Sequence, residues 1–292
     1  MRIFDPHIHM TSRTTDDYEA MRGVGIAAVV EPAFWMGQPR TNVGSFVDYF
    51  DSLIGWERHR AAQFGIRHHC TIALNPKEAG DPRLTEVVDL LPRWLVKDGV
   101  VAVGEVGYDS MTPAEDDAFE RQVALAIEHD LPVLVHTPHR DKAAGTRRTL
   151  DLLRATGLPP ELAVIDHLNE TTVELVAGTG CWMAFSIYPD TKMDPDRMVR
   201  ILREYGTERM LVNSAADWGR SDPLNTWRTG TAMLEAGFTD DQVDTVLWRN
   251  PAAFYGQSDR LELDDVEVAF GAAFEGSSIL RGERATAEAG AE

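Results

Sequence analysis

The feature that most constrains the fold is an alternation of short apolar runs with longer amphipathic stretches along most of the chain. The apolar runs are rich in β-branched residues and lie at 2–7, 26–30, 66–74, 100–106, 131–136, 162–166, 181–187 and 210–213. Stretches with helical periodicity lie between them at 43–64, 81–94, 113–129, 145–155, 171–177, 195–205 and 223–236. Strand and helix alternating eight times predict an α/β fold, the (β/α)8 or TIM barrel, rather than an open doubly wound sheet.

The domain organisation follows from this repeat and from the length of 292 residues. Barrels of this class reach about 250 residues as one domain, so we expect a single domain over residues 1–260. An additional C-terminal helix is predicted at 240–255, where it would close the barrel. Residues 261–292 become acidic and rich in small residues, which predicts a C-terminal extension that is partly disordered.

Four of the predicted strands end in side chains that bind metal ions. His7 and His9 follow the first strand, and Glu105, His136 and His167 follow the fourth, fifth and sixth. The carboxyl ends of barrel strands meet at one end of the barrel, so these side chains are expected to converge there. Residues two apart in a strand project to the same face, which would hold the two imidazoles of His7 and His9 in parallel. The sequence therefore predicts a site for divalent ions.

Two ions a few ångström apart require a bridging anion, and Glu105 is the suitable group. It lies between Gly104 and Gly107, which permit close backbone approach. Such a pair of ions lowers the pKa of a shared water and holds both the attacking and the leaving oxygen of a hydrolysis. A carboxylate after the eighth strand would take the proton of that water, and Asp217 is placed for this, with Asp222 as the alternative.

These motifs resemble those of the TatD-like metal-dependent hydrolases of the amidohydrolase superfamily. The resemblance runs from the amino terminus to about Gly256 and rests on the segments 5–9, 104–109, 131–136, 164–167 and 182–186. It implies a TIM barrel with a binuclear site. In that site His7 and His9 hold one ion, His136 and His167 hold the other, Glu105 bridges them, and Asp217 both binds and acts as the base. A glutamate at the bridge implies that no carbamylated lysine is needed.

The chain departs in three places from the members of this family that cleave DNA. The segment 73–77 reads Ala-Leu-Asn-Pro-Lys, where many members carry a histidine. The segment after His136 is longer than usual and contains His139 and Arg140, which are candidate substrate-binding residues. Asp217 lies about two residues later than expected. The resemblance therefore carries metal binding over to this chain, as a divergent branch, without carrying over the substrate.

The charge balance narrows the class of substrate. With 28 basic and 47 acidic residues the net charge is −19, which argues against binding of long nucleic acid. A basic group after His136, made of Arg140, Lys142, Arg147 and Arg148, leaves room for a local anion site. No apolar run approaches the roughly 20 residues of a membrane-spanning helix. No charged and apolar leader precedes His7, which predicts a cytoplasmic protein.

We therefore expect a metal-dependent hydrolase of a small molecule, in which activated water attacks a phosphoester or phosphodiester bond. Hydrolysis of a lactone, ester or amide is the first alternative, favoured by the negative charge of the chain. A catalytically silent metal-binding scaffold is the second. Two divalent ions are expected, with zinc favoured by the histidine-rich ligand set and manganese or magnesium as alternatives.

Overall fold

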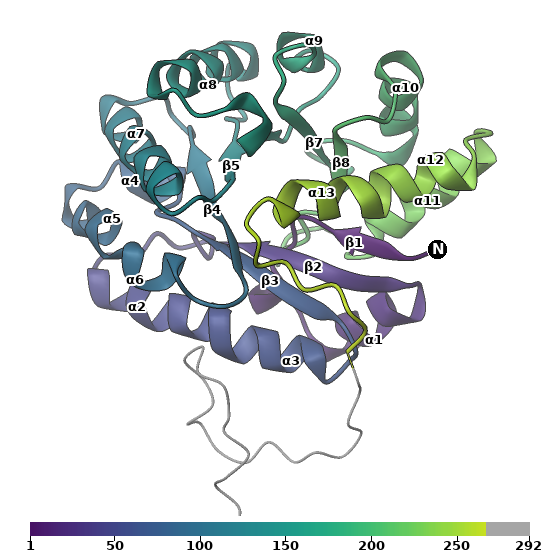
Figure 1. The fold of residues 1–292 in the computed structure, drawn as a ribbon, viewed down its shortest axis with the longest axis horizontal. Helices are drawn as coiled ribbons and strands as arrows, with labels where there is room; N and C mark the ends of the chain where they lie inside the picture. The colour runs from purple at the N-terminus through teal and green to yellow at the C-terminus, as the bar shows by residue number, and fades with distance from the viewer. Residues whose placement is uncertain (267–292) are drawn as a thin grey trace, which may run out of the picture.

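The computed structural model describes residues 1–266 and contains one sheet of eight parallel strands in chain order (Figure 1). The strands are β1 (Ile3–Asp5), β2 (Ile26–Pro32), β3 (Arg67–Ile72), β4 (Val100–Gly107), β5 (Val133–His136), β6 (Ala163–Asp166), β7 (Trp182–Ser186) and β8 (Met210–Asn213). Just beyond the strand ends, β8 and β1 are joined by backbone hydrogen bonds from Ala215 to His7 (2.8 Å) and from His9 to Ala216 (2.9 Å). The predicted TIM barrel is confirmed.

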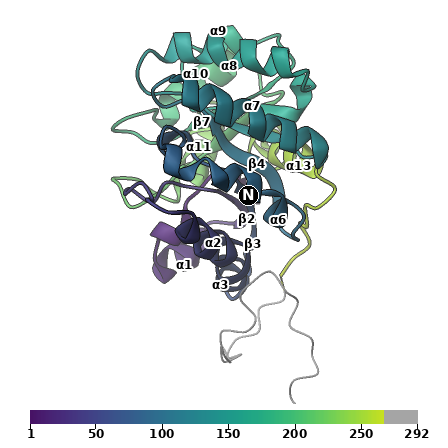
Figure 2. The ribbon, with the colours of Figure 1, turned by 90° about the vertical axis from the view of Figure 1, so that its left-hand side faces the viewer.

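Helices surround the sheet, as Figures 1 and 2 show. The α-helices are α1 (Thr15–Gly23), α2 (Val43–Ser52), α3 (Arg58–Ala62), α4 (Pro76–Ala79), α5 (Glu86–Leu90), α6 (Pro92–Leu95), α7 (Pro113–Glu128), α8 (Lys142–Thr156), α9 (Val173–Val176), α10 (Pro195–Tyr205), α11 (Asn225–Glu235), α12 (Asp240–Asp244) and α13 (Asn250–Gly256). Short 3-10 helices cover Met10–Ser12, Pro82–Leu84 and Pro160–Leu162, and π-helical turns cover Leu53–Glu57 and Thr245–Arg249.

The helix α1 was not predicted from the sequence. It is short, and of its side chains only those of Tyr18 and Met21 are buried, so its apolar stripe is narrow. Its sequence signal is instead a capping box, in which Thr14 and Asp17 satisfy each other's backbone N–H groups. All the helical stretches that were predicted correspond to helices. Three of them, 43–64, 81–94 and 240–255, are each divided into several short elements.

Alternate side chains of the strands form two separate apolar cores. Residues such as Val29 and Val133 face outward and pack beneath the helices. Residues such as Phe4, Leu134 and Leu211 face inward and form a second cluster with Phe254 and Tyr255 of α13. This division follows from the two-residue period of a strand, and it places polar inward-facing residues in the layer above, at the carboxyl ends of the strands.

The predicted C-terminal helix is confirmed, and it covers the amino-terminal end of the barrel. In Figure 1, α13 lies across the ring of strands. The buried Tyr255 hydroxyl donates a hydrogen bond of 2.8 Å to the carbonyl of Pro6, so this helix is tied to the segment that carries His7. The chain then continues along β3 and β1, where Glu262 N donates to His69 Nε2 at 3.1 Å and Arg2 donates to the carbonyl of Leu263.

The predicted disordered tail falls almost wholly on residues 267–292, which lie outside the described residues. The domain boundary at residue 260 therefore stays a prediction. Within the described part of the chain, Cys70 and Cys181 are free and buried. In the same part, none of the helices has both the length and the apolar character to cross a lipid bilayer.

Candidate metal-dependent active site

The strand β1 ends earlier than predicted, and His7 and His9 lie in the irregular segment that follows it. Asp5 is the last residue of the strand, and one of its carboxylate oxygens accepts hydrogen bonds from the backbone N–H groups of His7 (3.2 Å) and Ser214 (3.3 Å). His9 immediately precedes the 3-10 helix Met10–Ser12. Beyond the strand end the predicted alternation continues, because Ile8 bonds to Val30 of β2 and packs in the outer core, whereas His7 and His9 both bond to the segment after β8 and both approach Glu105.

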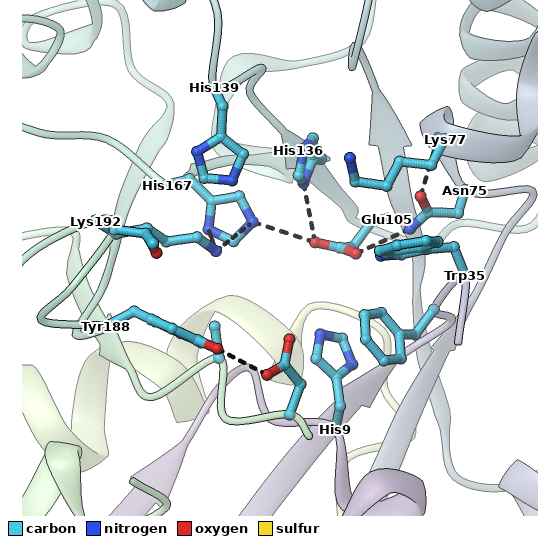
Figure 3. A pocket seen from close by; sticks show the side chains of 14 residues that line it. His9, Trp35, Asn75, Lys77, Glu105, His136, His139, His167, Tyr188 and Lys192 are labelled. Atoms are coloured by element: carbon cyan, nitrogen blue, oxygen red, sulfur yellow. Dashed lines mark hydrogen bonds and ion pairs between the residues drawn. The ribbon is translucent and has the colours of Figure 1, made fainter. Parts of the chain in front are cut away.

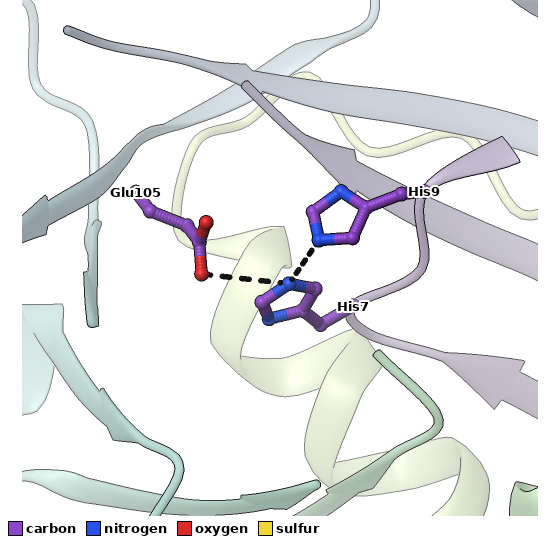
Figure 4. A group of neighbouring side chains, drawn as sticks. All are labelled: His7, His9 and Glu105. Atoms are coloured by element: carbon purple, nitrogen blue, oxygen red, sulfur yellow. Dashed lines mark hydrogen bonds and ion pairs between the residues drawn. The ribbon is translucent and has the colours of Figure 1, made fainter. Parts of the chain in front are cut away.

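The rings of His7 and His9 meet a carboxylate from the opposite side of the barrel (Figure 4). His7 Nε2 lies 3.0 Å from His9 Nε2 and 3.5 Å from Glu105 Oε1. The other ring nitrogen, His7 Nδ1, lies 2.6 Å from Asp166 Oδ2. Since the Asp166 carboxylate accepts a hydrogen bond from the N–H at Nδ1, His7 Nε2 is the nitrogen left to bind a cation.

Asp166 is itself held firmly in the barrel interior. Asn213 Nδ2 donates to both of its oxygens, at 3.0 and 3.1 Å. Burial alone would raise the pKa of Asp166, but His167 and His7 hold it well below its ordinary value, so the group remains ionised. Burial alone would lower the pKa of His7. The carboxylates of Glu105 and Asp166 have a larger effect in the opposite direction, so the pKa of His7 lies above its ordinary value. A cation at His7 Nε2 would therefore compete with a proton for this nitrogen.

Glu105 also lies against the histidines of β5 and β6. Its Oε1 is 3.4 Å from His136 Nδ1 and 3.4 Å from His167 Nε2, so one oxygen belongs to both groups of possible ligands. Burial would raise the pKa of Glu105, but His7 and His136 hold it well below the usual range. Its second oxygen, Oε2, accepts a hydrogen bond of 3.0 Å from Asn75. An ionised carboxylate shared between two histidine pairs is the arrangement expected of a bridging ligand.

The donor set fits divalent cations. Burial lowers the pKa of His9 and of His167 well below the ordinary value, which keeps both rings neutral, as metal ligands must be. Within the described residues, the buried nitrogens His9 Nδ1 and His136 Nε2 have no hydrogen-bond partner. Unpaired buried nitrogens beside a pocket indicate a site whose polar groups are arranged for a ligand. Imidazole and carboxylate together are typical ligands of zinc and related ions.

The structure brings Asp217 into the same pocket as these ligands. Its Oδ1 accepts hydrogen bonds from the hydroxyl of Tyr188 (3.0 Å) and from Gly219 N (2.7 Å), and it does not belong to the ligand groups found among residues 1–266. Ala215, which lies two residues before Asp217, also lines the pocket. Its backbone φ angle is 42°. The alternative, Asp222, lies outside the pocket, where it accepts a hydrogen bond from Leu224 N and pairs with Arg228.

The two predicted substrate-binding residues lie in different surroundings. His139 lines the pocket, where burial and the charge of Lys192 lower its pKa to about 4. Arg140 is exposed and does not line it. The basic group predicted after His136 is also dispersed, since Lys142 donates to Thr137 Oγ1 and the carbonyl of His167, and Arg148 pairs with Asp116.

Several pocket residues were not predicted from the sequence (Figure 3). The cavity has a volume of about 260 Å³, and its further polar lining residues are Asn75, Lys77, Tyr188, Thr191 and Lys192. Asn75 and Lys77 follow the end of β3, so the rule that barrel sites form at the carboxyl ends of strands could have identified them. Lys192 lies in the loop between β7 and α10, and no motif in the sequence marks it. Burial lowers its pKa.

A family model described as TatD related DNase matches residues 4–255. Among curated proteins, an uncharacterised metal-dependent hydrolase of Methanocaldococcus jannaschii is 26% identical over 257 residues, covering 87% of this chain and 99% of the relative. Among solved structures, the TatD-like protein of Archaeoglobus fulgidus aligns with a TM-score of 0.73 at 26% identity, covering 86% of this chain and 99% of that one.

More distant structures share the fold alone. The phosphotriesterase homology protein of Escherichia coli, solved with phosphate in its active site, aligns with a TM-score of 0.65 at 15% identity, over 87% of this chain and 98% of that one. A lactonase of Listeria monocytogenes aligns with a TM-score of 0.64 at 16% identity, over 87% of this chain and 94% of that one.

Proposed function

The chain belongs to the TatD related DNase family and is a metal-dependent hydrolase, and from this premise we propose that it hydrolyses a phosphate ester of a small molecule. The observation that carries the proposal is the position of Glu105 Oε1, which lies 3.4 to 3.5 Å from one ring nitrogen each of His7, His136 and His167. An ionised oxygen placed among three imidazoles supports a site for two cations. A cluster of buried imidazoles held together only by hydrogen bonds would not require a carboxylate at its centre.

We expect His7 and His9 to hold one ion, His136 and His167 to hold the other, and Glu105 to bridge them. Zinc is the favoured ion, with manganese and magnesium as alternatives. When bound, such ions supply Lewis acidity and lower the pKa of a water molecule in the pocket.

The remaining steps belong to side chains of the protein. Asp217 lies at the pocket with one oxygen held by Tyr188 and Gly219, which supports its role as the base that takes a proton from the attacking water. The water oxygen bonds to phosphorus, the bond from phosphorus to the ester oxygen breaks, and the leaving oxygen receives the proton that Asp217 took from the water. Asp166 holds His7 through Nδ1 and keeps its ring in position.

The phosphate ester is favoured over other bonds by the charge of the pocket. Lys77 and Lys192 line this cavity beside the carboxylates of Glu105 and Asp217, which are assigned to the cations and the water. Lys77 pairs with Asp109, so Lys192 is the positive charge left for a substrate. Such a cation in the cleft of an acidic protein favours an anionic substrate there. A cavity of about 260 Å³ lies just below the range of about 300 to 1,000 Å³ that ligand pockets commonly measure, so it suits a small substrate rather than a large one.

Hydrolysis of a lactone, ester or amide is the second candidate. It is supported by the apolar part of the lining, where Phe34 and Trp35 face the same cavity, and by the fold shared with the Listeria lactonase. The two substrate classes differ in the pocket charge that favours their binding. A phosphate ester is anionic and is favoured by lysines, whereas a lactone is neutral and gains nothing from them.

An assay of the purified chain, loaded in turn with zinc, manganese and magnesium, tests the proposal against a panel of phosphomonoesters, phosphodiesters and lactones. We expect hydrolysis of phosphate esters that Glu105→Gln abolishes. Hydrolysis of lactones alone would overturn the phosphate ester and leave the second candidate. The identity of the ion and a cytoplasmic location stay predictions.

A further inference from the structure

Lys192 reaches the centre of the pocket from a turn that is fixed by its own contacts. Its backbone N–H donates to the carbonyl of Tyr188 at 2.8 Å, and its carbonyl accepts a hydrogen bond of 2.7 Å from Arg197. The next residue, Met193, is fully buried. The lysine side chain is therefore positioned by the fold before any ligand binds, which lowers the entropic cost of using it.

The ammonium group of Lys192 lies beside the histidine cluster without a carboxylate partner. Its Nζ is 3.1 Å from His167 Nδ1 and 3.3 Å from His167 Nε2, as Figure 3 shows. Among residues 1–266 it forms no ion pair, whereas Lys77, the other pocket lysine, pairs with Asp109 at 2.6 Å. A partly buried cation without a counter-ion favours an anion at the position that it faces.

The opposite side of the pocket is lined by the rings of Phe34 and Trp35, and Trp218 packs against them without lining the cavity itself. The ring of Phe34 stacks on His9 with a centroid separation of 3.8 Å, Trp218 lies 4.5 Å from Phe34, and Trp35 lies 5.9 Å from Trp218. These rings come from the loops after β2 and β8, and Trp218 is 47% exposed. We call Phe34, Trp35 and Trp218 the aromatic wall.

The aromatic wall is built into the fold by a close approach of its two loops. A Cβ on Gly37 would lie 2.6 Å from the Trp218 ring, and Gly37 has a φ of 76°, so only glycine permits this packing. A large aromatic side chain that is held in place yet left exposed beside a pocket indicates a surface that contacts a ligand.

We propose that the pocket selects phosphate monoesters that carry a flat apolar group, with Lys192 holding a phosphoryl oxygen and the aromatic wall contacting the apolar group. This rests on the proposed function and names its substrate class. The dianionic phosphate matches a site with two lysines, one of them free of an acidic partner. Hydrolysis then releases inorganic phosphate and an alcohol or phenol, the water oxygen having replaced the ester oxygen on phosphorus.

The test measures binding of two phosphonates, whose C–P bond is not hydrolysed, to the metal-loaded full-length chain by isothermal titration calorimetry. Phenylphosphonate carries a flat apolar group and methylphosphonate does not. We expect phenylphosphonate to bind the wild-type chain about tenfold more tightly than methylphosphonate, because of stacking on the aromatic wall.

Variants separate the two parts of the pocket. Trp35→Ala is expected to abolish the preference for phenylphosphonate while leaving methylphosphonate binding within about twofold of wild type. Lys192→Met is expected to weaken both phosphonates about tenfold or more, with partial recovery in Lys192→Arg. The control Lys97→Met, which removes a lysine outside the pocket, should change neither. Metal content measured on each variant confirms that the site remains intact.

Equal binding of both phosphonates to the wild-type chain, or unchanged binding in Lys192→Met, would overturn this inference while leaving the proposed function in place if phosphate esters are hydrolysed. Failure of both phosphonates to bind a chain that hydrolyses lactones would overturn the inference and the proposed function together.

Discussion

His7 Nδ1 lies 2.6 Å from Asp166 Oδ2, and this contact orients the ring that presents Nε2 to Glu105. The two residues are far apart in the sequence, at the ends of β1 and β6. A carboxylate behind a metal-binding histidine fixes its tautomer and increases its basicity.

Replacing that carboxylate should weaken metal binding while leaving the fold intact. In Asp166→Asn the side chain keeps its shape but loses the charge that holds His7. We expect metal affinity to fall by about 10- to 100-fold. Titration with a competing chelator measures the affinity, and circular dichroism provides the control for folding. An unchanged affinity would show that Asp166 has no role in orienting His7.

Because Asp217 is assigned as the group that accepts the proton of the attacking water, its replacement should lower kcat, whereas replacement of an acidic residue outside the pocket should not. Asp217→Asn should lower kcat by about 100-fold or more, because general-base catalysis typically contributes that much. Asp222→Asn is the matched control, since Asp222 lies outside the pocket and pairs with Arg228. Equal loss of kcat in the two variants would contradict the assignment of the base.

The C-terminal helix should support the metal-binding segment through a single hydroxyl. Tyr255→Phe removes the donor to the carbonyl of Pro6, which leaves that buried acceptor unpaired. We expect the free energy of unfolding to fall by about 1–2 kcal/mol. Urea denaturation measures this change. A loss below about 0.3 kcal/mol would mean that the helix is held by packing of its aromatic rings alone.

Most of the architecture could be predicted from the sequence, because the alternation of strands and helices is imposed by burial and repeats regularly. All eight strands were identified, since inward and outward positions are both apolar in parallel barrel strands. The convergence of His7 and His9 was also expected, and the alternation of an extended segment accounts for it even though the strand itself ends at Asp5.

The part of the site that was missed depends on loops and on contacts between distant residues. Lys192 lies in a loop without a periodic pattern, and its position depends on the burial of Met193. Asp166 was noted beside His167, yet its pairing with His7 depends on the closure of the barrel. Arg140 illustrates the opposite error, because proximity in sequence to His136 did not bring it into the pocket.

A buried carboxylate outside the site predicts an unusual dependence of stability on pH. Burial and the neighbouring carboxylate of Glu31 raise the pKa of Glu57 to about 7. Tyr18 and Arg60 contact the same group, at 3.2 and 3.0 Å. The folded state therefore binds a proton at Glu57 between about pH 4.3 and pH 7, while the unfolded state has released it. This group's contribution to stability accordingly falls as the pH rises through that window.

Glu57→Gln should remove this dependence. We expect the variant to lose less stability than the wild-type chain between pH 5 and pH 8, by up to about 3 kcal/mol. Urea denaturation at the two pH values measures the difference, with Glu235→Gln as the control because Glu235 is exposed on α11. A wild-type chain and a Glu57→Gln variant with parallel pH profiles would contradict the raised pKa.

The central claim is that Glu105 bridges two cations held by histidine pairs on either side of it. Anomalous diffraction from crystals of the zinc-loaded chain tests this most directly. We predict two peaks, one against His7 and His9 and one against His136 and His167, each within about 2.0–2.2 Å of an oxygen of Glu105. In Glu105→Gln we expect at least one peak to disappear. A map without peaks at these histidines, or with zinc bound elsewhere, would contradict the account.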